Sequence, residues 1–162
     1  MSTPRSYHQA KAQDYVFILW GDQFEEKAVA TFVAELRNAS LCVKVVGLSG
    51  PRTAGKHGLV LGADITLSEA LALAHKAICV IVPCSAPSIK RLDNDPRVLD
   101  FFRQAHTHRS QFVVSENNAL EKSSMSKLTI APEDVFFYAD YPDLTQFARE
   151  MANELLNHTV KL

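Results

Sequence analysis

Two nucleophilic side chains follow short apolar runs of the kind that form buried parallel strands. Cys84 comes after Ala77–Val82 and Pro83, and Ser115 comes directly after Phe112–Val114. The carboxyl ends of the strands form the functional edge of a parallel α/β sheet, so we expect both side chains there. Cys84 could act as a thiolate if its surroundings lower its pKa. Ser115 could act as a nucleophile if a base lies beside it.

Most histidines that could serve as this base lie at the wrong end of the predicted strands. His106 and His108 precede the strand that ends at Ser115, and at ~3.3 Å per residue they lie up to roughly 20 Å away. His75 also precedes its strand, His158 lies at the end of the last predicted helix and His8 lies in the N-terminal extension. His57 is therefore the one histidine compatible with this argument. We therefore expect Ser115 to be a structural turn residue or a hydrogen-bonding group, not a catalytic serine.

Cys84 has no lysine, arginine or histidine beside it in the sequence that would lower its pKa. No paired ligand spacing accompanies it either, so we expect no metal site and no cofactor. A glycine-rich connection resembles a nucleotide-binding loop, with Gly50, Gly55 and Lys56 in place. His57 stands where that loop needs serine or threonine, and an extended segment follows where it needs a helix. We therefore reject a nucleotide site.

The pattern of apolar residues alternates between the periods of strands and helices. Strands are expected at residues 15–20, 41–48, 59–61, 77–82, 112–114, 128–130 and 135–138, and helices at 24–38, 65–73, 96–105 and 144–157. Asp95 and Pro96 are typical of the N-cap and first position of a helix. Residues 115–118 are expected to form a turn. This order predicts an α/β three-layer sandwich with a mostly parallel sheet, with residues 59–61 on a side excursion.

Composition limits the classes of function. The chain has 162 residues, 47% of them apolar, which predicts a single domain over residues 14–162 after a polar, flexible extension over residues 1–13. A net charge of −1 indicates no nucleic-acid binding, and no apolar run approaches the ~18–20 residues that cross a bilayer. Three cysteines, Cys42, Cys79 and Cys84, indicate a reducing, cytoplasmic setting without a disulfide framework.

Several short segments, in their order and spacing, resemble the ThiJ/PfpI family of the class I glutamine amidotransferase-like superfamily. The matching segments are Phe24-Glu25-Glu26, Val45–Leu48, Gly55–Gly58, Ala63–Ala70 and Tyr138–Asp143. The resemblance covers nearly the whole chain from Tyr15 and implies a flavodoxin-like sandwich, usually dimeric or larger. Active members are cysteine hydrolases, glyoxalase-like enzymes, chaperones or oxidative-stress proteins. Their site combines a cysteine on a strand-to-helix elbow, a first-helix glutamate and often a histidine.

This chain departs from the family pattern at each of those positions. The nucleophile position falls on Ser115, or on Val114 if the alignment shifts by one residue. The glutamate position falls on Ala28 and the histidine position on Ala131. The Pro-Gly-Gly segment that helps to form the family's oxyanion site is Pro83-Cys84-Ser85 here. Together these departures indicate that the family's chemistry has been lost.

We therefore expect a pseudoenzyme, a non-catalytic ThiJ/PfpI-like domain that binds a small molecule or a protein partner through the remnant pocket. The expected pocket residues are Gly21, Asp22, Glu25, Cys84, Ser85, Ser115, Glu116 and Asn117. We also expect a cytoplasmic homodimer that contacts neither nucleic acid nor membrane, and the resemblance implies a role in stress. The alternative is a thiol-dependent enzyme, hydrolase or glyoxalase-like, or a redox or stress sensor, using Cys84.

Overall fold

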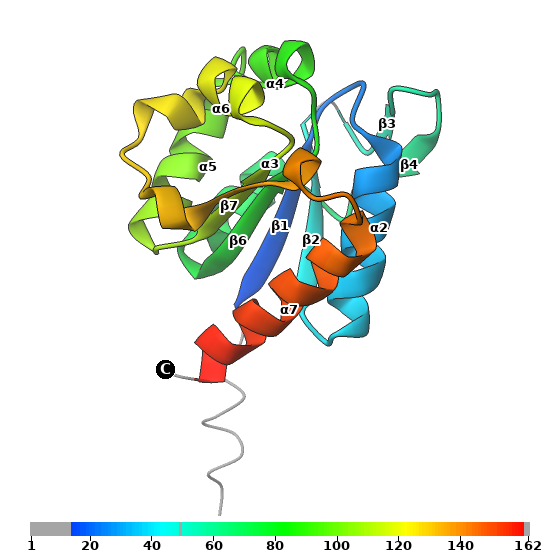
Figure 1. Ribbon diagram of the computed structural model, residues 1–162. Coiled ribbons are helices and arrows are strands. Elements are labelled where there is room, and N and C mark those ends of the chain that lie inside the picture. Colours follow the sequence, from blue (N-terminus) through cyan, green and yellow to red (C-terminus); the bar gives the residue numbers. More distant parts are fainter. Residues whose placement is uncertain (1–13, 49, 161–162) are drawn as a thin grey trace, which may run out of the picture.

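A sheet of six strands, with every neighbouring pair parallel, lies at the centre of the fold (Figure 1). Its order is β5-β2-β1-β6-β7-β8. The strands are β1 (Tyr15–Trp20), β2 (Cys42–Gly47), β5 (Ile65–Thr66), β6 (Ala77–Val82), β7 (Gln111–Val114) and β8 (Val135–Phe137). The computed structural model describes residues 14–48 and 50–160, so the extension expected over residues 1–13 lies outside the described residues.

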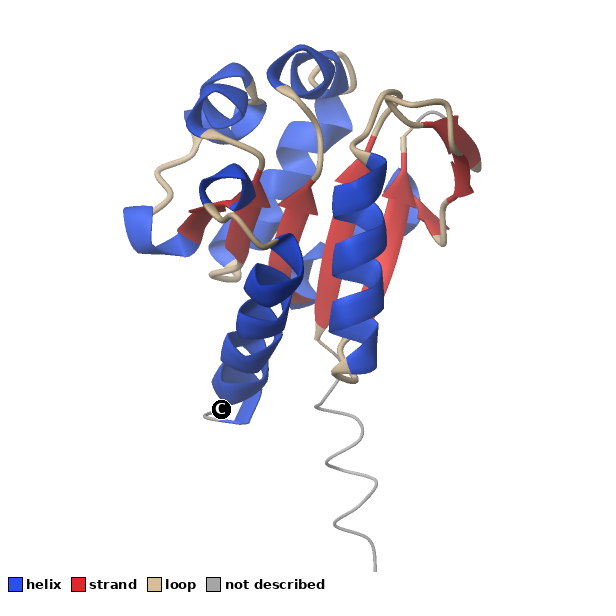
Figure 2. Cartoon of the chain, turned by 45° about the vertical axis from the view of Figure 1, so that its right-hand side comes forward, coloured by secondary structure: helices blue, strands red, loops and turns tan. Residues whose placement is uncertain are grey.

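Helices cover both faces of this sheet, which makes three layers (Figure 2). On one face α2 (Glu26–Asn38) packs beside α7 (Leu144–Val160), and on the other α3 (Leu67–Leu73) packs beside α5 (Pro96–Thr107). Two short helices, α4 (Ala86–Leu92) and α6 (Asn117–Lys122), lie together beyond the carboxyl ends of the strands. The predicted three-layer α/β/α sandwich is confirmed. Within the described ranges, no helix combines the length and apolarity needed to cross a membrane.

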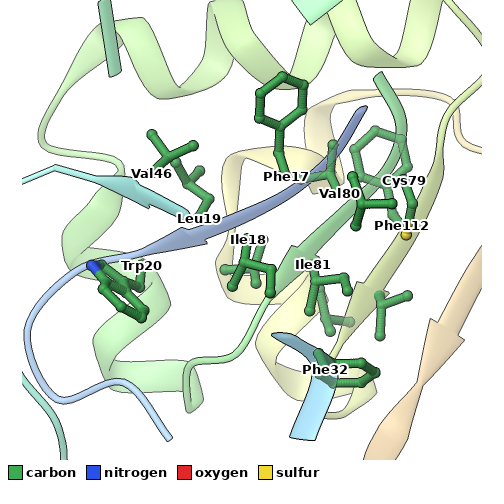
Figure 3. Close-up of a cluster of buried hydrophobic side chains, with 14 of the residues drawn as sticks. Phe17, Ile18, Leu19, Trp20, Phe32, Val46, Cys79, Val80, Ile81 and Phe112 are labelled. Carbon is green, nitrogen blue, oxygen red and sulfur yellow. The ribbon is translucent and has the colours of Figure 1, made fainter. Parts of the chain in front are cut away.

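The apolar run of β1 explains why this strand is central. Successive side chains of a strand point to opposite faces, so a continuous apolar run suits a strand covered on both sides. Phe17 and Leu19 lie on one side of β1, and Ile18 and Trp20 lie on the other (Figure 3). Phe17 meets Phe101 of α5 edge-on, with ring centroids 5.3 Å apart. Apolar side chains therefore fill the space between the sheet and the helices on both of its faces.

Helix starts were predicted well where a capping residue marks them. Asp95 caps α5, its carboxylate accepting a hydrogen bond from the Arg97 amide at 3.0 Å, with Pro96 in the first turn. Thr66 and Glu69 form a capping box at the start of α3. The residue before this box, Ile65, pairs with Val46 as part of β5, so the helix predicted from residue 65 begins two residues later.

Three local predictions were wrong or incomplete. Residues 128–130 form no strand, because β8 pairs with the edge of β7 instead. The side chains of Leu128 and Ile130 pack against the core. The turn expected at residues 115–118 leads into α6, and α4 was not foreseen. The expected excursion is a hairpin of β3 (Arg52–Ala54) and β4 (Val60–Gly62), whose first strand was not predicted.

Candidate functional site

The sheet changes direction between its two central strands, and this switch point locates the candidate site. From β1 the chain crosses to β2 on one side, whereas from β6 it crosses to β7 on the other. In open α/β sheets, ligands bind beyond the carboxyl ends of the strands at such a point. Gly21 and Asp22 follow β1 there, and Cys84 follows β6. The Glu25 amide donates to the Pro83 carbonyl at 2.8 Å, which joins the two segments.

Ser115, at the family's nucleophile position, is buried and already has a partner. Its hydroxyl donates to the Cys84 carbonyl at 3.0 Å, and its own carbonyl accepts from the Ala139 amide at 2.9 Å. Among the interactions of the described residues, none joins a histidine to Ser115. Without a base the hydroxyl is a poor nucleophile. Val114, the alternative position, is a buried strand residue without reactive chemistry.

Tyr138 belongs to the site, and the sequence reasoning missed it. It begins the short helical turn η4 (Tyr138–Asp140), and its hydroxyl donates to the Glu25 carboxylate. Burial raises the pKa of this phenol well above its usual range, and the Glu25 hydrogen bond and charge raise it further. Its ring packs edge-on against Phe32 of α2, with centroids 5.7 Å apart. Tyr138 is therefore a fixed donor inside the site.

Cys84 is at the predicted place but is inaccessible. Its side chain has no exposed surface, and burial raises the pKa of its thiol to about 12. A main-chain hydrogen bond from Gly21 opposes this rise, and the charges of Glu25 and Asp22 add to it. The thiolate is the reactive form of cysteine, so the thiol is held in its unreactive state.

Most of the remaining predicted residues form a polar rim of the site, whereas Gly21 is buried. Asp22, Glu116 and Asn117 are exposed and Ser85 is half-buried. Asp22 lies near Arg91, with 3.6 Å between its carboxylate and the guanidinium Nε. With Tyr138 added, the site has two parts: a cluster of half-buried Glu25 with buried Cys84, Ser115 and Tyr138, and a polar rim around it. We call the first part the closed cluster.

Open space lies beside the closed cluster. A hollow of about 330 Å³ is lined by Gly21, Asp22, Arg91 and Leu92, among others, and its lining contains none of the four cluster residues. A second, of about 440 Å³, lies over the ends of β2 and β5. Within the described part of the chain, no group of three or more histidine, cysteine or acidic residues is arranged to hold a metal ion.

The other two departures from the family pattern are also seen in the structure. Ala28 is buried in α2, and Ala131 is half-buried before η3 (Pro132–Asp134). Neither side chain can transfer a proton. His57, the histidine that the sequence left open, lies exposed on the β3–β4 hairpin, where its amide donates to Glu26 at 2.8 Å.

Solved structures share this architecture over almost the whole chain. A DJ-1 superfamily protein of Salmonella typhimurium matches with a TM-score of 0.70 and 19% identity, over 89% of this chain and 91% of that one. DJ-1beta of Drosophila melanogaster matches with a TM-score of 0.70 and 16% identity, over 92% and 96%. The chain has the DJ-1/ThiJ/PfpI fold.

This fold confirms the flavodoxin-like architecture implied by the ThiJ/PfpI resemblance and supports that assignment. A putative protease I from Bacteroides thetaiotaomicron matches with a TM-score of 0.58 and 12% identity, over 66% of this chain and 65% of its own. No protein-family model and no curated protein matches the sequence. At these identities the likeness concerns the fold, and function has to be argued from the site.

Proposed function

We propose that this chain is a non-catalytic ThiJ/PfpI-like domain whose remnant active site is closed by its own side chains. One observation carries the proposal. The Ser115 hydroxyl donates to the Cys84 carbonyl, and the Tyr138 hydroxyl donates to the Glu25 carboxylate. The side-chain groups that a substrate would have to contact are thus already hydrogen-bonded to other groups of the protein.

The chemistry of active ThiJ/PfpI members needs a thiolate and side chains that accept and donate protons. Ser115 supplies a hydroxyl without a base, and Cys84 supplies a buried thiol whose pKa is raised to about 12. Alanine at positions 28 and 131 supplies neither acid nor base. These facts also count against the thiol-dependent alternative, because Cys84 would have to ionise at an apolar site with two carboxylates nearby.

The function left to such a domain is binding. The exposed part of the predicted pocket is a polar rim that includes Asp22, Glu116 and Asn117. Since the closed cluster lies beneath this rim, a protein surface fits better than a small molecule that would need a deep pocket. We therefore propose that the domain is a cytoplasmic homodimer that recognises a protein partner. A small-molecule ligand would occupy the hollow beside Gly21.

An assay of turnover tests this proposal. Methylglyoxal and a set of peptide substrates would be offered to the wild type and to Ser115→Ala, with Ser110→Ala as the matched control. Ser110 is also buried and donates to a main-chain carbonyl, that of Ala77, but at the amino end of β7. We expect no turnover above buffer in any of the three proteins. Turnover that Ser115→Ala abolishes and Ser110→Ala retains would overturn the proposal.

A further inference from the structure

The residues that line the hollow beside Gly21 differ in polarity with depth. Gly21 and Leu92 are buried in its lining, and Leu48 is half-buried. Asp22 and Arg91 of the same lining are exposed. The inner part of the hollow is therefore apolar, and charged side chains lie at its mouth. Its volume of about 330 Å³ is at the lower end of the range for ligand-binding cavities, so the ligand that fits it is small.

Close packing at Gly21 fixes the inner part of the hollow. A Cβ atom at Gly21 would lie 2.6 Å from Cδ2 of Leu92, so the end of β1 lies directly against the end of α4. This contact needs glycine at position 21, because any side chain there would displace Leu92. The apolar lining is thus in place before a ligand enters, as in most small-molecule sites.

Asp22 and Arg91 carry opposite charges side by side at the mouth of the hollow. The Arg91 Nε atom lies 3.6 Å from Oδ1 of Asp22, which is longer than a hydrogen bond, and the two side chains are 45% and 62% exposed. Exposed ion pairs of this kind contribute little to the stability of a fold. Both groups are therefore available to the charges of a ligand.

The nearby charged groups are already held by hydrogen bonds. Asp95, also in the lining, accepts from Nη2 of Arg97 at 2.7 Å. Arg97 lines the second hollow, and its Nη1 donates to the Ser68 hydroxyl at 2.9 Å. The Asp22–Arg91 pair differs from these groups because no hydrogen bond joins its members.

Two neighbouring charges of opposite sign match a small zwitterion. An α-amino acid carries its ammonium and its carboxylate on the same carbon atom. The carboxylate can face the guanidinium of Arg91, whose planar donors suit carboxylates, while the ammonium faces Asp22. A simple anion would be repelled by Asp22, and a simple cation by Arg91. The charges therefore favour a ligand that carries both signs.

We propose that the hollow beside Gly21 binds a free α-amino acid with an apolar side chain. The carboxylate of the ligand faces Arg91, its ammonium faces Asp22, and its side chain lies against Leu48 and Leu92. This site is separate from the closed cluster, none of whose residues belongs to its lining. The inference rests on the small-molecule part of the proposed function, but its test measures binding and not turnover, so the two can fail separately.

Calorimetric titration with leucine and two analogues tests the need for both charges. Leucinamide lacks the carboxylate and N-acetyl-leucine lacks the ammonium, so each should bind at least about tenfold more weakly than leucine. Absence of leucine binding at millimolar concentrations overturns the proposal. Equal affinity for the three compounds also overturns it, because the charges of the ligand would then not be recognised.

Variants at the mouth of the hollow test the two assigned contacts. Arg91→Gln and Asp22→Asn should each weaken leucine binding at least about tenfold. Arg103→Gln is the matched control, because Arg103 also lies 3.6 Å from an exposed carboxylate, that of Asp100, but outside the lining of the hollow. It should bind leucine as the wild type does. Leucine binding that Arg91→Gln and Asp22→Asn retain, or that the control loses equally, overturns the proposal.

The apolar contact is tested by comparing leucine with glycine, which carries the same charges but no side chain. Leu48→Ala should weaken the binding of leucine and leave that of glycine unchanged. Equal losses for the two ligands would contradict the placement of the side chain against Leu48. If the protein turned over a substrate, the non-catalytic function would be refuted, whereas these binding results would still decide the present inference.

Discussion

Glu25 and Glu26 are neighbours in the chain, yet they serve two regions of opposite character. Glu25 accepts the Tyr138 hydroxyl in the closed cluster, and Glu26 accepts two amides of the β3–β4 hairpin. In the closed cluster, Cys84, Ser115 and Tyr138 are buried, and the two hydroxyl groups are hydrogen-bonded within the protein. On the hairpin, apolar groups are exposed. The hydroxyl groups at the carboxyl ends of the strands are therefore held within the protein, whereas the hairpin leaves Leu59 and Val60 exposed to solvent.

Two ionisable groups of these regions show how burial and hydrogen bonds compete. Cys84 gains little that compensates its burial, so its pKa is raised to about 12. Burial would also raise the pKa of Glu26, but hydrogen bonds from the main chain of Glu26, Leu59 and His57 outweigh it, and the pKa is lowered. A desolvated group stays charged only where donors replace the lost water.

The largest expected effect is on the closed cluster. Tyr138→Ala removes a buried ring that packs on Phe32 and should destabilise the fold by about 3–5 kcal/mol in urea unfolding. Tyr138→Phe keeps the ring and removes only the hydroxyl that Glu25 accepts, so about 1–2 kcal/mol is expected. Equal losses in the two variants would show that packing contributes nothing beyond the hydrogen bond.

A smaller effect is expected where the hairpin meets α2. A Cβ at Gly55 would lie 2.5 Å from the Cγ and Cδ atoms of Glu26, so Gly55→Ala must displace this carboxylate. We expect a loss of about 1–3 kcal/mol. The matched control is Gly62→Ala in the same hairpin, whose Cβ would meet its nearest atom, the Pro51 carbonyl oxygen, at 3.7 Å. That variant should change stability by no more than about 1 kcal/mol. Equal losses of stability in the two variants would show that the contact with Glu26 is not what destabilises Gly55→Ala.

The smallest effect is a dependence of stability on pH. The folded pKa of Glu26 lies below its ordinary value of 4.5, so the ionised carboxylate stabilises the fold above pH 4.5. That contribution is lost as the pH falls from 4.5 through the folded pKa. Thermal unfolding across this range should therefore show a steeper loss for the wild type than for Glu26→Gln. Parallel curves would indicate that the Glu26 charge does not support the hairpin.

Much of the fold could be predicted because its signals are local. The run Ala77–Val82 is apolar throughout, as in a strand buried on both faces, and Asp95-Pro96 marks a helix start by capping chemistry alone. The strand expected at residues 128–130 does not form, because strand pairing depends on other segments of the chain. Here β8 pairs with the edge of β7. Short helices such as α4 have too few turns to show a helical period.

The site could be predicted only in outline. Residues that follow parallel strands meet at one edge of the sheet, so the sequence predicts Cys84 and Ser115 at the same edge. The closed cluster was not foreseeable, because it includes Tyr138, whose hydroxyl donates to Glu25 across 113 residues of sequence. No local pattern encodes such a contact. A tyrosine inside a matching family segment was the one available signal, and it was taken for a strand residue.

Cysteine labelling tests most directly whether the chemical groups of the remnant site are closed off from solvent. The native protein would be treated with iodoacetamide over a range of pH, and each cysteine followed by mass spectrometry. Half-buried Cys42 is the internal reference for fully buried Cys79 and Cys84. We predict that Cys84 labels far more slowly than Cys42 until the protein is unfolded. Fast labelling of Cys84 with an apparent pKa well below ~8.5 would contradict the account and point to an activated thiol.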